Sequence, residues 1–101
     1  MTHMMTVLEI VIPASLQPHD RGELYDLPLC DIFDELDDGD IVGGGTYVAS
    51  GVIESCHVVF ETSDVDRIMP HVLQLLASSN APAGTVLRQL EPNQIELHVV
   101  E

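Results

Sequence analysis

Two histidines and two glutamates are the side chains whose type and placement could support acid–base chemistry. His57 and His98 lie in stretches with the alternating pattern of a β-strand, as do Glu9 and Glu61. A histidine acts as a general base when a carboxylate holds its ring in one orientation. His57 or His98 would then be the base, and Glu61 or Glu9 its orienting partner. The alternative for each histidine is an ordinary exposed or half-buried side chain.

The spacing of the other reactive side chains does not support nucleophilic or metal-dependent chemistry. Cys56 and His57 are adjacent in a predicted strand, so they point to opposite faces and neither can activate the other. The histidines show no HxH or HExxH spacing. An acidic segment aligned on Gly39 has the glycine of a calcium loop, but Leu36 and Gly45 stand where oxygen ligands are required. No catalytic residue, metal or cofactor is therefore assigned.

Three consecutive glycines, residues 43–45, precede Thr46 and superficially suggest a phosphate-binding loop. Such a loop joins a strand to the start of a helix and uses a nearby lysine. Here a second strand is predicted to follow, and the chain contains no lysine. The glycines instead indicate a β-bulge, or a place where another group packs closely against the backbone.

The segment 20–40 is the densest concentration of charge in the chain. It holds nine carboxylates against one cation, Arg21, a local net charge of −8 within a total of −14. A field of this strength repels phosphate and attracts cationic partners. We expect a surface that meets a basic protein, and the alternative is an acidic surface that serves solubility alone. The candidate partner-binding residues are Asp31, Asp34, Glu35, Asp37, Asp38 and Asp40.

Hydrophobic periodicity predicts two amphipathic helices. Apolar residues at i, i+3, i+4 and i+7 indicate a helix that starts near Pro28 and ends at Gly39, and a second helix over 65–76. The segment 14–26 is predicted to be a long loop because it holds Pro18, Gly22 and mostly polar residues. The predicted caps are Asp26 for the first helix and Ser63 or Asp64 for the second.

Strands predicted around these helices complete a β-α-β-β-α-β order with an extra strand at the end. Their ranges are 6–13, 41–49, 52–61, 85–90 and 95–100. Two split β-α-β units of this kind give a ferredoxin-like sandwich, an α+β fold with an antiparallel sheet and both helices on one face. The other, open face is half apolar, and we expect a homodimer to form across it. Its predicted members are Val7, Glu9, Val11, His57, Val59 and Glu61.

Length and composition restrict the remaining possibilities. The 101 residues suit one domain over 6–101 with a flexible arm over 1–5, and 46% hydrophobic content excludes a disordered acidic tail. With three arginines and no lysine, nucleic-acid binding is excluded. The sequence has no apolar run of membrane-spanning length and no basic region typical of a signal peptide, so a cytoplasmic location is expected. Cys30 and Cys56 are expected to be free thiols, although a bridge between them would be allowed if helix and strand packed suitably.

Two short motifs resemble those of a group of small bacterial ferredoxin-like proteins without established activity. They are GGGT at 43–46 and APAGTVL at 81–87. The resemblance covers most of the chain by element order. Because both motifs consist largely of glycine and proline positions, it implies backbone geometry and transfers no site residues.

Two functions from different classes follow from these observations. The first, which the sequence favours, is a non-enzymatic acidic interaction module, in its most concrete form an immunity-type inhibitor of a cationic toxin whose carboxylates imitate phosphates. The second is a dimeric ferredoxin-like enzyme or small-ligand-binding protein with a pocket on the open sheet face.

Overall fold

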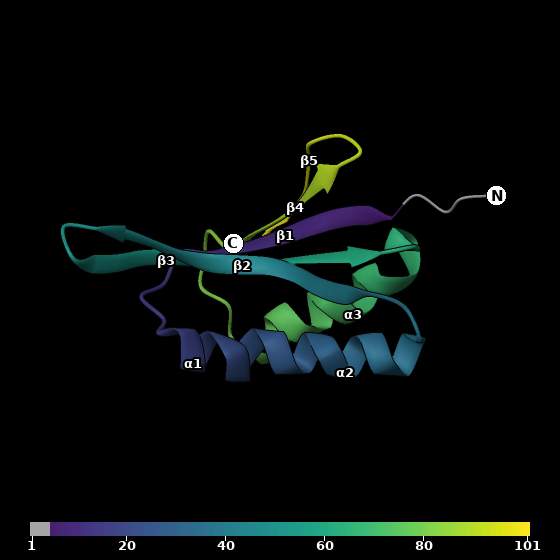
Figure 1. The fold of residues 1–101 in the computed structure, drawn as a ribbon, viewed down its shortest axis with the longest axis horizontal. Helices are drawn as coiled ribbons and strands as arrows, with labels where there is room; N and C mark the ends of the chain where they lie inside the picture. The colour runs from purple at the N-terminus through teal and green to yellow at the C-terminus, as the bar shows by residue number, and fades with distance from the viewer. Residues whose placement is uncertain (1–4) are drawn as a thin grey trace.

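The computed structural model describes residues 5–101, which form a five-stranded antiparallel sheet with helices packed on one face (Figure 1). Of the predicted N-terminal arm, only Met5 lies within the described residues. The strands run in the order β2-β3-β1-β4-β5. Their bounds are β1 Thr6–Ile12, β2 Asp40–Ala49, β3 Val52–Thr62, β4 Val86–Glu91 and β5 Ile95–Val99. The helical segments are α1 Pro18–Arg21, η1 Gly22–Asp26, α2 Leu27–Leu36 and α3 Val65–Ser78.

The hydrophobic core lies between the sheet and the helices, which confirms the predicted α+β class. Alternate residues of the two central strands point toward α2 and α3 and are fully or almost fully buried. Burial of each large apolar side chain contributes roughly 1.5–3 kcal/mol. The strand residues in this core are Leu8, Ile10, Ile12, Cys56, Val58 and Phe60, and the helical residues include Leu29, Phe33, Ile68 and Val72.

The prediction of a long loop over 14–26 is wrong, because most of that segment is helical. Pro18 occupies the first turn of α1, where its missing N–H costs nothing, and a π-helical turn joins α1 directly to α2. Gly22 has helical φ and ψ angles of −58° and −46°. Tyr25 anchors the turn by burying its ring. Asp26 is helical too and makes no capping hydrogen bond, so the predicted cap is also wrong.

The end of α2 is set by two residues with positive φ. The helix ends at Leu36, where Asp37 adopts the left-handed conformation and its N–H donates to the Phe33 carbonyl. Gly39 follows with a φ of +108°, and a Cβ on it would lie 2.5 Å from Cδ1 of Phe33. This turn therefore requires glycine for both its backbone conformation and its contact with the core.

The second helix and the hairpin before it match their predictions. The Asp64 side chain accepts a hydrogen bond from the Arg67 N–H and caps α3, which continues through Pro70. Ser50 and Gly51 both have positive φ and form the tight turn between β2 and β3. The distal end of this hairpin projects past the start of the helical layer (Figure 1). No helix within residues 5–101 is long and apolar enough to cross a membrane.

Candidate functional site

A buried carboxylate lies at the centre of the sheet face that the helices leave open. Glu9 belongs to β1, the central strand, and its neighbours across the sheet are Val59 on β3 and Arg88 on β4. The residue is 4% exposed although it points away from the hydrophobic core. A charged group so well covered needs partners, because an unpaired buried charge is strongly unfavourable.

Arg88 and His57 are those partners, one from each adjacent strand. The Arg88 Nε donates to Oε1 of Glu9 over 2.7 Å, and Nη2 of the same guanidinium contacts that oxygen as well. On the other side, Nδ1 of His57 lies 2.7 Å from Oε2 of Glu9. Both oxygens of the carboxylate are thus engaged, and the histidine ring is held in one orientation. We call these three residues the open-face network.

Two β2 residues complete the surroundings of His57. The ring of Tyr47 stacks on it, with the ring centroids 5.2 Å apart and the planes inclined by 27°. Gly45 is its cross-strand partner, and a Cβ there would lie 3.1 Å from Nε2 of the imidazole. On the helix side, a Cβ on Gly44 would lie 3.4 Å from Nη1 of Arg21. The register shift between Ile41 and Gly43 and these close approaches confirm the sequence-based interpretation of the glycines.

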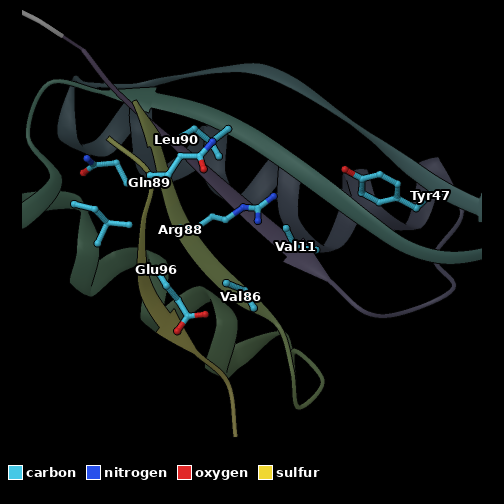
Figure 2. A pocket seen from close by; sticks show the side chains of 9 residues that line it. Val11, Tyr47, Val86, Arg88, Gln89, Leu90 and Glu96 are labelled. Atoms are coloured by element: carbon cyan, nitrogen blue, oxygen red, sulfur yellow. The ribbon is translucent and has the colours of Figure 1, made fainter. Parts of the chain in front are cut away.

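A groove of about 410 Å³ adjoins the open-face network. Figure 2 shows Arg88 in its middle, with the guanidinium pointing toward Val11, Tyr47 on one side, and Gln89 and Leu90 on the other. The C-terminal hairpin supplies much of the wall, because β4 and β5 turn away from the helices here (Figure 1). The residues that line the groove are Val11, Tyr47, Val86, Arg88, Gln89, Leu90, Gln94, Ile95 and Glu96.

The structure brings some of the predicted acid–base residues together and separates others. Glu9 and His57 are hydrogen-bonded, whereas Glu61 has no hydrogen-bonded side-chain partner among residues 5–101. His98 lies near Leu73 and Leu76 of α3, on the helix-covered side. The remaining predicted members of the open face are half-buried beside the network, namely Val7, Val11 and Val59.

Arg88 and Tyr47 are the site residues that the sequence analysis missed. Both lie in predicted strands, but the strand order that puts β4 beside β1 was not available from periodicity. The signal that could have found Arg88 is its rarity. A chain with three arginines and an uncompensated glutamate on its first strand invites a search for the cation that pairs with that glutamate.

The predicted partner-binding carboxylates fall into two groups. Asp38 turns toward β3, where its side chain accepts hydrogen bonds from Oγ1 of Thr62 at 2.7 Å and from the Ser63 N–H at 3.0 Å. Partial burial favours its neutral form, but these hydrogen bonds outweigh that effect and lower its pKa. The other five are exposed at the surface, namely Asp31, Asp34, Glu35, Asp37 and Asp40.

Cys30 lies on α2 beside several carboxylates of the acidic segment. Partial burial raises the pKa of this thiol, and the charges of Asp34, Asp26, Asp40 and Asp31 raise it further. Cys30 is exposed and Cys56 is buried, and both are free thiols. No group of three or more His, Cys, Asp or Glu side chains in the described part of the chain is arranged to hold a metal ion.

Fold and site together define an α+β protein with a hydrogen-bonded polar network and a groove on its open sheet face. A scan against protein-family models finds no matching family, and a search of curated proteins finds no match. The resemblance to small bacterial ferredoxin-like proteins therefore stays a prediction.

Proposed function

We propose that this protein binds a small organic molecule in the open-face groove. The observation that carries the proposal is the position of Arg88, which lines the concave surface and is held in place by the same buried carboxylate that holds His57. Binding sites of this kind combine mostly apolar walls with a few oriented polar groups, and the groove volume lies within their usual range of about 300–1,000 Å³. The strand order β2-β3-β1-β4 and the one-sided helices support a ferredoxin-like classification, with β5 as the additional strand.

The lining of the groove favours a neutral, flat ligand with one hydrogen-bond acceptor. The Arg88 side chain is 47% exposed, so the guanidinium can still donate beyond its contact with Glu9. Glu9 already neutralises that charge, and a net charge of −14 repels anions, so the acceptor suits a carbonyl better than a carboxylate. Tyr47 offers an exposed ring for stacking, and Val11, Val86 and Ile95 offer apolar contact.

A catalytic version of the proposal assigns the base to His57. Glu9 holds Nδ1, so Nε2 is the ring nitrogen left to accept a proton, and a molecule that reached it would have to extend from the groove past Tyr47, because Tyr47 lines the groove and His57 does not. The ring is held between Glu9 and Tyr47, which limits the orientations it can adopt. In this version Glu9 is a positioning residue, because it acts through the histidine.

The test of ligand binding uses amide chemical shifts in two-dimensional NMR. Benzamide, phenylacetamide and indole-3-carboxamide are titrated at millimolar concentration into the wild type, Arg88→Gln and the matched control Arg67→Gln. We expect shifts of the Val11, Val86 and Leu90 amides in the wild type and the control, and their loss in Arg88→Gln. No shift at these amides with any probe, or equal shifts in both variants, would contradict the proposal.

A second candidate function is favoured by the exposed carboxylates of α2 and the turn after it. Asp31, Asp34 and Glu35 are exposed on α2 at the three- and four-residue spacing that places them on one side of a helix. Such a surface suits a basic protein partner, and immunity to a cationic toxin is its most concrete form. Long-range attraction would speed association, and salt would weaken it.

This second proposal is tested with hen lysozyme and polyarginine as basic probes. Asp34→Asn/Glu35→Gln removes two charges from the acidic surface, and Glu96→Gln/Glu101→Gln removes two charges elsewhere. We expect binding of the wild type to weaken steeply with salt and the first variant to lose the larger share of affinity. Equal losses of affinity in the two variants would show that net charge alone attracts the probes. That result would contradict the proposal of a dedicated acidic binding surface.

A further inference from the structure

The edge strand β2 and the turn after it form an uncharged segment at one edge of the sheet. No charged residue occurs over 41–53, although 20% of all residues are charged. This segment covers nearly all of β2 and continues through the turn into the start of β3. We call it the uncharged hairpin.

The outer edge of β2 is open to pairing. β2 ends the strand order, so the backbone groups that face away from β3 meet no further strand within residues 5–101, and a side chain reaches the strand at the Gly45 carbonyl, which accepts a hydrogen bond from Nη1 of Arg21. Proteins usually protect such edges with charges, proline or bulges. The opposite edge strand, β5, contains Glu96, whereas β2 has only Asp40 at its start. Its register shifts fall near its two ends and leave Gly43 to Tyr47 in regular pairing with β3.

The same hairpin exposes apolar side chains. Val48 and Val52 are each 59% exposed, and Tyr47 and Val42 are about half exposed. The distal end of the hairpin projects past the helical layer, so the helices do not cover it (Figure 1). A two-stranded ribbon is marginally stable in water unless further strands or a second layer pack against it. A partner that paired a strand with β2 and covered these apolar side chains would stabilise the uncharged hairpin.

A second copy of this chain supplies the same kind of open edge, and electrostatics decides which part of the surface two copies can bring together. Two molecules of net charge −14 repel each other over most of their surfaces, and contact is least unfavourable where neither carries charge. A two-fold axis perpendicular to the strands makes two β2 edges antiparallel, and each copy then presents the same row of backbone N–H and C=O groups to the other. We infer that the protein forms a homodimer by antiparallel pairing of β2 with β2, which joins two five-stranded sheets into one of ten strands.

Pairing of β2 with β2 differs from the interface predicted from the sequence, which was a homodimer across the open sheet face. The open face holds the Glu9 network and the groove, and β2 pairing leaves both accessible to a ligand. The dimer thus does not depend on the proposed ligand. It also responds to salt in the opposite sense from binding of a basic protein, since salt screens the repulsion between two acidic copies.

The test measures molecular mass by sedimentation equilibrium at low and high salt for three proteins. These are the wild type, Val48→Glu on β2, and Val99→Glu on β5 as the matched edge-strand control. We expect a dimer for the wild type and Val99→Glu, with a larger dimer fraction at high salt. Val48→Glu should raise the dimer dissociation constant about tenfold or more, because each copy would bring a charge into a contact surface that is otherwise uncharged and apolar.

A second measurement keeps the test independent of any folding defect. Hydrogen exchange of the wild type is compared at low and high protein concentration. Protection of β2 amides, but not β5 amides, should increase with concentration. A wild type that stays monomeric at high concentration and high salt, equal weakening by Val48→Glu and Val99→Glu, or concentration-independent exchange along β2 would each overturn the inference.

Discussion

Glu9→Ala should destabilise the fold by about 2–4 kcal/mol. The substitution removes the acceptor of Arg88 and the partner of His57 in one step, and it leaves space in the middle of the sheet. Breaking a fully buried ion pair costs about 3–5 kcal/mol. The loss of stability expected for Glu9→Ala is smaller than this, because the Arg88 side chain is 47% exposed and can hydrogen-bond to water instead. The free energy of unfolding, obtained from urea titration, measures the effect.

Two further variants distinguish the stability contributed by the open-face network from the cost of any substitution on this sheet face. Glu9→Gln keeps the shape and one acceptor oxygen but removes the charge, so its loss should be smaller than that of Glu9→Ala. Glu61→Gln changes a half-buried glutamate on the same face that has no hydrogen-bonded side-chain partner among residues 5–101, and it should change stability by less than about 0.5 kcal/mol. If Glu9→Ala is as mild as Glu61→Gln, the network does not stabilise the sheet as its geometry indicates.

The parts of the fold that sequence predicted well are those whose signal is local. The alternation of Leu8, Ile10 and Ile12 with polar or smaller residues describes a strand with one buried face, and that face is the one the helices cover. The stripe through Ile68 and Val72 likewise predicts α3, even with Pro70 inside it. In both cases the pattern directly records which side of the element is buried.

The segment before α2 shows where local reasoning fails. Pro18 and Gly22 are typical of loops, but proline suits a first helical turn and glycine is tolerated in a helix when packing compensates. That compensation comes from Tyr25, which is buried in the core, and from Arg21, whose Nη1 donates to the Gly45 carbonyl. These contacts link residues distant in sequence, so no reading of the segment alone reveals them.

The candidate site also combines features that the local sequence pattern predicts with features that depend on the pairing of distant strands. Strand alternation placed Glu9 and His57 on one face of the sheet. It therefore predicted that a glutamate on this face would orient a histidine. It could not choose Glu9 over Glu61, or His57 over His98, because that choice depends on register and on strand order. Arg88 is 79 positions from Glu9 in sequence, and only the pairing of β1 with β4 brings the two together.

Gly39→Ala should destabilise the protein by about 2–5 kcal/mol, since it combines two separate costs. The φ of +108° disfavours any residue with a Cβ, and that Cβ would lie 2.5 Å from Cδ1 of Phe33. Gly51→Ala is the matched control, because Gly51 also has a positive φ, of +78°, but nothing lies within 4 Å of its Cβ position. Its cost should be about 1–2 kcal/mol. The difference between the two variants measures the clash with the core.

A double-mutant cycle locates that clash. Phe33→Leu shortens the side chain that the new Cβ would meet, so it should cost less in the Gly39→Ala background than in the wild type. The shared ring also connects the turn after α2 to β3, because Phe33 packs against Phe60 with 5.8 Å between ring centroids. Equal costs of Gly39→Ala and Gly51→Ala, or additive effects of Gly39→Ala and Phe33→Leu, would show that the ring yields without penalty and that backbone conformation alone demands glycine at this turn.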